Sequence, residues 1–565
     1  MKYSLPCFFY RCCRHHRRVV LALFMGVGAT NSYALDAHTP AILPVALAEK
    51  PLPEAIMAKL SAANIPADSL SMVVQPLDAA PAAQSANAPS ANDTLISYHP
   101  NTPRTPASTQ KLIPTYIALD TLGKDFVWQT KLYQHGVVWR GTLYGDIIVA
   151  GSGAPKLENT QLSALLSMIK SQGIERVDGN LIIDNRQFRD VKFDVNAFDG
   201  KGLRPYNAQP NALLTDFGTL KVTLEPIVTT AATTAKSTNT ASQPTASQTQ
   251  DYQVSVSPLL ADFSYPSTLS SSQQPCNTSQ DDWIANLSPT QLSFNTLPSI
   301  HCGKQERYLT FPDGDALIKK QISADWQKIL PNFQGDIRFA DDERLLSLQK
   351  PLSTALPWYV RGYLNWVKAP QTPRLIGYVA SNPLSEQIKD INQHSNNVMT
   401  EQIALSLPLY ASPKLAGQQQ VSDYPKTFAL MQRWWQQHLP NDTAPVMSRA
   451  SGLCRDCQIT PSSMLALLTL AYQSPNFAVF RESMGVAGES GTIKALKWRQ
   501  PNNPAIGHAW IKTGTLDNVT AMAGYVQGQS GKWYAVVGLI NADNAKNNDK
   551  AKAVLDEMLA WTATK

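Results

Sequence analysis

The chain has 565 residues and a formal net charge of +6. This length suggests two to four domains and is ample for a buried core. Hydrophobic residues make up 43% and charged residues 16% of the chain, which excludes a collagen, a coiled coil and a fully disordered protein.

The N-terminal segment is basic and then apolar. Residues 1–34 contain five Lys or Arg residues and no acidic residue, an apolar run over 19–29, and small residues at Ser32 and Ala34. This order is typical of a secretory signal peptide, and the run is too short for a stable membrane anchor. We therefore predict a signal peptide over residues 1–34 and a periplasmic mature protein, with an uncleaved anchor as the alternative. Contact with a membrane is expected to be peripheral at most.

Removal of this segment lowers the formal charge from +6 to +1, so the charge gives no reason to expect a nucleic-acid partner. The mature chain keeps Cys276, Cys302, Cys454 and Cys457. An even number of cysteines in an exported protein favours disulfides, and we predict the pairs Cys276–Cys302 and Cys454–Cys457. A redox pair or half of a zinc site is the alternative for Cys454 and Cys457.

The remaining elements are taken in chain order. Apolar residues at helical spacing predict a helix over 52–60, and strand-like runs follow at 70–77 and 94–98. A helical run over 111–122 comes next. Residues 227–250 are almost wholly Thr, Ala, Ser and Gln, and this low-complexity segment cannot bury a core.

The C-terminal region predicts a hairpin. A strand-like segment leads into Lys512-Thr513-Gly514, strands are expected at 519–527 and 532–541, and an amphipathic helix at 548–562 closes the chain. Helices and antiparallel strands in this order predict an α+β domain with helices that cover a sheet.

The motif Ser-x-x-Lys occurs at Ser108/Lys111, Ser167/Lys170 and Ser347/Lys350. The second and third lie in helical runs and are expected to be ordinary surface residues. Ser108 instead opens a helical run, where unpaired backbone N–H groups can stabilise negative charge on a substrate carbonyl. Lys111 returns to the same face three residues later. Burial and a neighbouring cation would keep this amine neutral, so that it can deprotonate Ser108.

Two further motifs offer residues that could act together with Ser108 and Lys111. Lys-Thr-Gly occurs once, at residues 512–514, after a strand that could pair with an extended peptide. Lys512 could hold a carboxylate and lower the pKa of Lys111. Ser-x-Asn occurs several times, and Ser395-Asn396-Asn397 is preferred because it opens a helical run between the other two motifs. A helix cap is the alternative role for Ser395.

Together these motifs resemble the D-alanyl-D-alanine carboxypeptidase/endopeptidase family, the class C low-molecular-weight penicillin-binding proteins. The resemblance rests on Pro-Ala-Ser108-Thr-Gln-Lys111, His-Ser395-Asn-Asn397 and Ile-Lys512-Thr513-Gly514-Thr515. It implies a β-lactamase/transpeptidase-like domain, α+β in class, that is split by a large inserted α/β region. The catalytic domain would comprise residues 35–130 and 356–565, and the insertion residues 131–355.

The resemblance also implies roles. Ser108 would be the nucleophile, Lys111 the base and Ser395 the proton donor to the leaving amine. Asn397 would hold the substrate amide, and Lys512 and Thr513 the terminal carboxylate. Backbone N–H groups of Ser108 and Thr515 would form the oxyanion hole. Thr513, Gly514 and Thr515 would be the substrate-binding residues.

The implied substrates are peptidoglycan stem peptides, with β-lactam antibiotics as covalent inhibitors and no metal or organic cofactor. Some relatives use an acidic residue of the insertion to hold a diamino acid, for which Asp199 and Asp216 are candidates. Arg449-Ala450 stands where the family often has Asp-Gly. A β-lactamase or esterase of the same fold, and a non-catalytic peptidoglycan-binding module, are the rival functions.

Overall fold

The structure is a computed structural model that describes residues 47–77, 94–227, 251–276, 286–340, 358–359, 372–411 and 420–565. The predicted signal peptide lies outside these residues, and so does the low-complexity segment apart from Ile227. In the described part of the chain, no helix combines the length and the apolar character needed to cross a membrane.

A sheet built from both ends of the chain forms the centre of the first part of the fold. Its strand order is β15-β16-β17-β18-β1-β2, and every pair is antiparallel. The strands are β1 (Leu70–Pro76), β2 (Ile96–Tyr98), β15 (Gly485–Val486), β16 (Ala509–Leu516), β17 (Val519–Gln527) and β18 (Trp533–Asn541). The predicted hairpin is therefore confirmed, and β1 pairs with β18 next to it.

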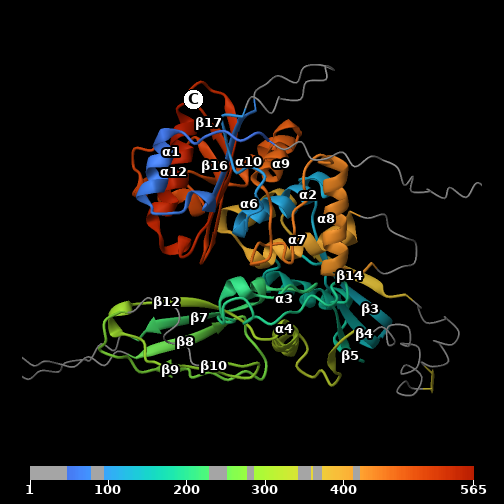
Figure 1. The fold of residues 1–565 in the computed structure, drawn as a ribbon. Coiled ribbons are helices and arrows are strands. Elements are labelled where there is room, and N and C mark those ends of the chain that lie inside the picture. The colour runs from blue at the N-terminus through green and yellow to red at the C-terminus, as the bar shows by residue number, and fades with distance from the viewer. Residues whose placement is uncertain are drawn as a thin grey trace, which may run out of the picture. The chain divides into compact units, whose positions relative to one another are not determined.

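Both faces of this sheet are covered because side chains alternate along each strand. Met72 and Val74 face a core shared with helices α1 (Glu54–Ala62) and α12 (Asp549–Ala563), which pack against each other (Figure 1). Val73 faces the other core, which contains α2 (Leu112–Leu122) and α9 (Pro461–Gln473). These faces confirm the α+β class.

Further helices complete the second core. They are α6 (Leu384–His394), α7 (Asn397–Tyr410), α8 (Tyr424–His438) and α10 (Phe477–Glu482). A short helix, α11 (Leu496–Arg499), precedes β16.

The segment between α2 and α6 forms sheets of its own. One has the order β13-β6-β4-β3-β14, with β5 beside β4. Its strands are β3 (Gln129–Trp139), β4 (Thr142–Ala150), β5 (Arg176–Asp178), β6 (Leu181–Asp184), β13 (Ile337–Phe339) and β14 (Arg374–Ala380). β4, β6 and β13 are parallel, as expected for an α/β insertion. Since β14 pairs with β3, this sheet extends past residue 356, where we had predicted the return to the catalytic part.

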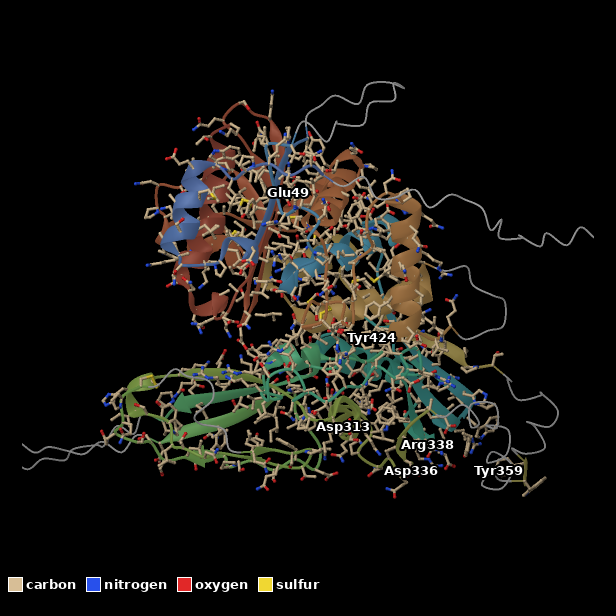
Figure 2. All side chains as sticks on the ribbon, in the orientation of Figure 1. Glu49, Asp313, Asp336, Arg338, Tyr359 and Tyr424 are labelled. Atoms are coloured by element: carbon tan, nitrogen blue, oxygen red, sulfur yellow. A yellow bond between two sulfur atoms is a disulfide. The ribbon has the colours of Figure 1, made fainter. Side chains whose placement is uncertain are left out.

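Two helices accompany this sheet, α3 (Asn159–Ser167) and α4 (Gly314–Ile329). Asp313, labelled in Figure 2, caps α4 by accepting from the backbone N–H groups of Asp315 and Ala316.

A second sheet of the insertion has the order β12-β7-β8-β9 and is antiparallel. Its strands and the adjacent hairpin are β7 (Thr219–Pro226), β8 (Tyr252–Ser257), β9 (Thr268–Leu269), β10 (Asn286–Leu287), β11 (Leu292–Ser293) and β12 (Gln305–Thr310). Cys276 and Cys302 form a disulfide in this region, as predicted.

Candidate active site

Ser108 lies in a 3-10 turn, Ala107–Lys111, that continues directly into α2. We had expected the helix to open at this point, but the α-helical part begins at Leu112. Pro114 is therefore the third residue of α2, in the first turn, where a missing N–H costs little. The other Ser-x-x-Lys motif in the described part, Ser167/Lys170, is exposed as expected.

The amine of Lys111 has three neighbours from distant parts of the chain. It lies 2.9 Å from Ser108 Oγ, 2.7 Å from Asn397 Oδ1 and 2.6 Å from the backbone oxygen of Ser451. A neutral amine has two N–H groups and one lone pair. If Asn397 and Ser451 accept the two N–H groups, the lone pair points at the Ser108 hydroxyl.

Electrostatics favours that neutral form. Lys111 is completely buried, and burial, together with the nearby charge of Lys512, holds its pKa well below the ordinary value. The carboxylate of Glu401 acts in the opposite direction. An amine that is neutral near physiological pH can take the proton of a serine hydroxyl.

Ser395 and Lys512 form a second pair on the same site. Lys512 Nζ lies 3.0 Å from Ser395 Oγ and 2.8 Å from the carbonyl of Thr513. Ser395 adopts φ 57° in the link between α6 and α7, and its neighbour Asn396 caps α7 by accepting from Met399 N. The N-cap of α7 thus belongs to Asn396, while Ser395 is the left-handed C-cap residue of α6 and its hydroxyl faces Lys512. Burial lowers the pKa of Lys512 to about 7.

Gly514 lets β16 approach the nucleophile closely. A Cβ at this position would lie 2.7 Å from the carbonyl oxygen of Pro106 and 3.0 Å from the backbone nitrogen of Ser108. The backbone N–H of Ser108 is therefore close to β16, as an oxyanion hole shared with Thr515 requires. Thr513 Oγ1 lies 2.6 Å from Thr492 Oγ1 at the rim of the site.

β16 has an open edge beside the nucleophile. Its outer neighbour β15 pairs only with Trp510 and Ile511, and within the described ranges no strand covers residues 512–516 on that side. An extended peptide could therefore add to this edge.

Glu401 and the loop after Met447 were not predicted as part of the site. Glu401 lies one helical turn after Asn397 and is buried. Its carboxylate accepts from the backbone N–H groups of Ala450 (3.2 Å) and Ser451 (2.9 Å). Through these bonds, Glu401 fixes the carbonyl that faces Lys111.

A cavity of about 260 Å³ adjoins Asn397 and Ser451. The loop 193–198 of the insertion and the loop 448–456 line it. Its carboxylates are Asp194, Asp456 and the buried Glu401. Neither acidic candidate from the sequence lines the cavity: Asp199 accepts from Tyr206 and Asn207, and Asp216 accepts from Asn159 N.

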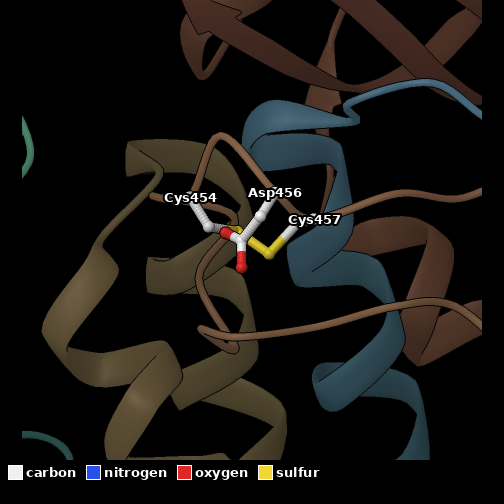
Figure 3. Close-up of side chains that lie close together, drawn as sticks. All are labelled: Cys454, Asp456 and Cys457. Atoms are coloured by element: carbon white, nitrogen blue, oxygen red, sulfur yellow. A yellow bond between two sulfur atoms is a disulfide. The ribbon is translucent and has the colours of Figure 1, made fainter.

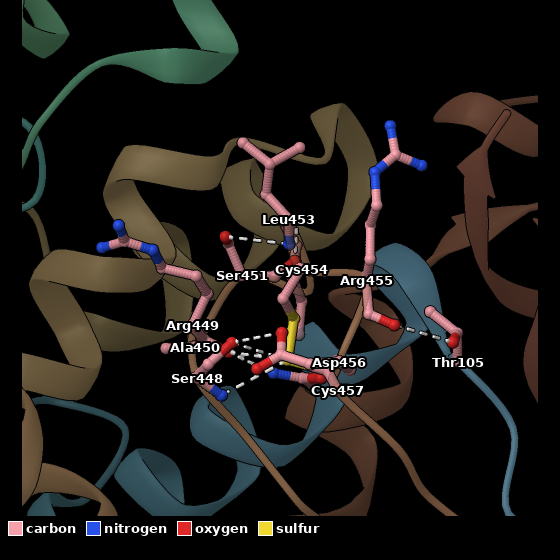
Figure 4. The surroundings of a disulfide bond; sticks show 12 residues. Thr105, Ser448, Arg449, Ala450, Ser451, Leu453, Cys454, Arg455, Asp456 and Cys457 are labelled. Atoms are coloured by element: carbon pink, nitrogen blue, oxygen red, sulfur yellow. Dashed lines mark hydrogen bonds between the residues drawn. A yellow bond between two sulfur atoms is a disulfide. The ribbon is translucent and has the colours of Figure 1, made fainter. Parts of the chain in front are cut away.

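Cys454 and Cys457 form the predicted disulfide beside this cavity (Figure 4). Asp456 lies close to both sulfur atoms (Figure 3), a grouping that could in principle hold a metal ion. The sulfurs are bonded to each other and cannot serve as thiolate ligands, while the Asp456 carboxylate accepts from Ser448 Oγ at 2.7 Å. The contacts of this grouping are thus those of a disulfide-linked loop.

Comparison with known proteins agrees with this geometry. Over 97 residues, 17% of this chain, the sequence is 35% identical to D-alanyl-D-alanine carboxypeptidase DacB of Haemophilus influenzae, and the match spans 20% of that protein's length. The crystal structure of penicillin binding protein 4 from the same organism has a similar fold (TM-score 0.64, 18% identity, 89% of this chain and 99% of that chain). Its complex with a β-lactam gives a TM-score of 0.61 at 17% identity over the same shares.

A family model provides the assignment. The model of the D-Ala-D-Ala carboxypeptidase 3 (S13) family matches residues 69–262 and 347–565. These ranges make up more than half of the sequence and contain Ser108, Ser395 and Lys512. The chain therefore belongs to the D-Ala-D-Ala carboxypeptidase 3 (S13) family.

Proposed function

We propose that the protein is a serine D-Ala-D-Ala carboxypeptidase/endopeptidase that acts on peptidoglycan stem peptides and is acylated by β-lactams. One contact carries this proposal: the buried amine of Lys111 lies 2.9 Å from Ser108 Oγ. Family membership and the β-lactam complex of the H. influenzae protein support it.

The reaction follows from the positions of these groups. Lys111 takes the hydroxyl proton as Ser108 Oγ bonds to the carbonyl carbon of the penultimate D-alanine. The N–H groups of Ser108 and Thr515 stabilise the oxyanion, for which each donor is worth on the order of 10²–10³-fold in rate. As the C–N bond breaks, Ser395 passes its proton to the leaving amine and takes up the proton that Lys111 had accepted, so that the Ser395 hydroxyl and the neutral Lys111 amine are both restored. Water then hydrolyses the ester, which releases the shortened peptide and restores Ser108.

Substrate binding uses the two ends of the same site. Lys512 and Thr513 bind the terminal carboxylate of the substrate, and Asn397 holds its amide. Asn397 is itself positioned, because its Nδ2 donates to the carbonyl of Tyr206 at 3.0 Å.

The β-lactamase alternative needs a base that activates the hydrolytic water. Glu401 is the acidic residue that acts on Lys111 electrostatically, but both of its oxygens accept backbone N–H groups. A carboxylate in that role is poorly placed to activate water, so we expect the penicilloyl-enzyme to be long-lived. Rapid turnover of a chromogenic cephalosporin would favour the β-lactamase instead.

The decisive variant is Ser108→Ala. It should lose all labelling by fluorescent penicillin while its circular dichroism and melting temperature stay unchanged. Ser167→Ala is the matched control, because Ser167 begins the exposed Ser-x-x-Lys motif. This variant should be labelled by fluorescent penicillin to the same extent as the wild-type protein. Labelling of Ser108→Ala at the same site would refute the assignment. Mass spectrometry of digested monomeric and cross-linked muropeptides then separates carboxypeptidase from endopeptidase action.

We further propose that the protein works in the periplasm after removal of residues 1–34. The two disulfides support an oxidising compartment. Protein isolated from the periplasm should begin at Leu35, and N-terminal sequencing that instead finds the intact leader would contradict this.

A further inference from the structure

The open edge of β16 gives the substrate a direction. A peptide that pairs antiparallel with residues 512–516 runs opposite to the strand, so its carboxylate lies near Lys512 and its amino end points past Leu516. This inference rests on the proposed function, because it assumes a stem peptide on this edge. The leaving group lies at the Lys512 end, and whatever precedes the stem peptide lies at the Leu516 end.

A second cavity, of about 590 Å³, begins where β16 ends. Leu516 and Thr105 line it on the side of the nucleophile segment. Amide and hydroxyl side chains dominate the remainder, with Arg455 and Asp543 as its charged groups. The polar lining consists of Asn64, Ser69, Thr105, Asn518, Asn541 and Asn548.

Some of these polar groups form hydrogen bonds within the protein, and others are available to bind a ligand. Asn541 pairs with the backbone of Thr105 in both directions, and Asn548 caps α12. Asn518 uses its Oδ1 to accept from Asn544 N. Within the described part of the chain, the side chains of Asn64 and Ser69 and the amide nitrogen of Asn518 make no hydrogen bond. These groups can donate to and accept from a neutral ligand.

The direction of the stem peptide places its amino end toward this cavity. Asp517 and Asn518 form the turn that joins β16 to β17, so the cavity lies at the end of β16 past which the peptide would continue. In a stem peptide, three residues separate the scissile D-alanine from the sugar and span about 10 Å when extended. A sugar attached to a peptide whose scissile D-alanine lies beside Gly514 would therefore lie beyond Leu516. We propose that this cavity binds the N-acetylated sugar that carries the stem peptide, a neutral ligand rich in hydroxyl and amide groups.

Binding can be measured without catalysis. A soluble disaccharide-tripeptide carries the sugar but lacks both D-alanines. Its affinity for the wild-type protein should exceed that of the sugar-free tripeptide by about tenfold, the effect of one or two net hydrogen bonds. Ser69→Trp, which fills the cavity, should remove this preference. Lys59→Trp on the exposed face of α1 is the matched control and should retain it.

Two outcomes would overturn the inference: equal affinities of the wild-type protein for the two tripeptides, or a sugar preference that survives in a folded Ser69→Trp variant. Circular dichroism and melting temperature establish that the variant is folded. If that variant does not fold, Asn518→Asp, whose anion cannot donate from the amide position, should reduce the preference and serves in its place. Failure to cleave any D-Ala-D-Ala substrate would contradict the proposed function while leaving this binding result interpretable.

Discussion

The amine of Lys111 donates a hydrogen bond to the backbone carbonyl of Ser451 across 2.6 Å, although 340 residues separate them in sequence. The Glu401 carboxylate accepts from the backbone N–H groups of Ala450 and Ser451 and so fixes the position of that carbonyl. The side chain of Gln110, next to Lys111, donates to the carbonyl of Arg449 in the same loop. The loop thus accepts one hydrogen bond from Lys111 itself and one from the residue before it. The orientation of the Lys111 lone pair depends on how firmly this loop is held.

Glu401→Gln should separate the positioning of Lys111 from its charge. A carboxamide offers one acceptor oxygen where the carboxylate offers two, so the loop loosens and maximal acylation should fall roughly tenfold or more. Because the carboxylate raises the pKa of Lys111, its loss lowers that pKa. The acidic limb of the acylation profile should therefore move to lower pH.

Stopped-flow acylation by a reporter penicillin over a range of pH measures both effects. Glu482→Gln, at an exposed position at the end of α10, should leave both unchanged. An unaltered acidic limb in Glu401→Gln would show that the carboxylate does not act on Lys111.

The lowered pKa of Lys512 predicts that activity falls at alkaline pH. Its pKa of about 7 means that the ammonium is present below this pH and is lost as the pH rises through it. Since kcat/KM reports groups of the free enzyme, this constant for a carboxylate-bearing substrate should fall above about pH 7, about tenfold per pH unit. Lys512→Arg stays charged throughout and should abolish this limb, at a lower maximal rate. Persistence of the limb in that variant would assign it to another group.

Gly514→Ala should impair acylation by moving β16 away from the nucleophile. The added Cβ meets backbone atoms of Pro106 and Ser108, which cannot rotate aside. Loss of one oxyanion contact corresponds to a decrease on the order of 10²–10³-fold. Gly314→Ala is the matched control, because its Cβ would enter open space at the start of α4. Normal penicillin labelling of Gly514→Ala would show that the close approach is unnecessary.

The two disulfides should differ in what they stabilise. Cys454–Cys457 closes a short loop, with a sequence separation of 3, and Cys276–Cys302 a longer one, with a separation of 26. Chain entropy predicts a loss of unfolding free energy of about 2 kcal/mol for the short link and about 4 kcal/mol for the long one. The rate of acylation should depend more on the short link than on the long one, because the short link belongs to the loop that faces Lys111.

Double Cys→Ser variants of each pair test this by denaturant titration and penicillin acylation. A slower reaction is expected for the Cys454/Cys457 variant alone. Equal acylation rates in the two variants would mean that the link near the site has no role in positioning.

The sequence identifies the serine and the two lysines that the structure brings to one site. Ser108, Lys111 and Lys512 lie in short motifs whose spacing follows from local geometry. A backbone carbonyl such as that of Ser451 has no such signature, since every residue has one and only the tertiary fold selects it. Glu401 is one helical turn after Asn397, which is a usable signal, but most helical glutamates face solvent.

The fold shows the same division. β17 and β18 are long, apolar and joined by a glycine-containing turn, so their pattern predicts them closely. β9, β10 and β11 have two residues each, and a period cannot be read from two residues. β14 is mainly apolar and reads as a strand, but its pattern carries no sign of the sheet that it joins, so its pairing with β3 past residue 356 could not be predicted.

The pairing of β1 with β18 also determines when, during synthesis of the chain, the central sheet can form. Leu70 faces Ile540 in this sheet, so the nucleophile segment is made early but its supporting strands are made last. The insertion can form its own sheets while the chain is still growing. Active enzyme then arises only after β18 is complete. A nascent chain therefore contains Ser108 for most of its synthesis but stays inactive until that strand has been made.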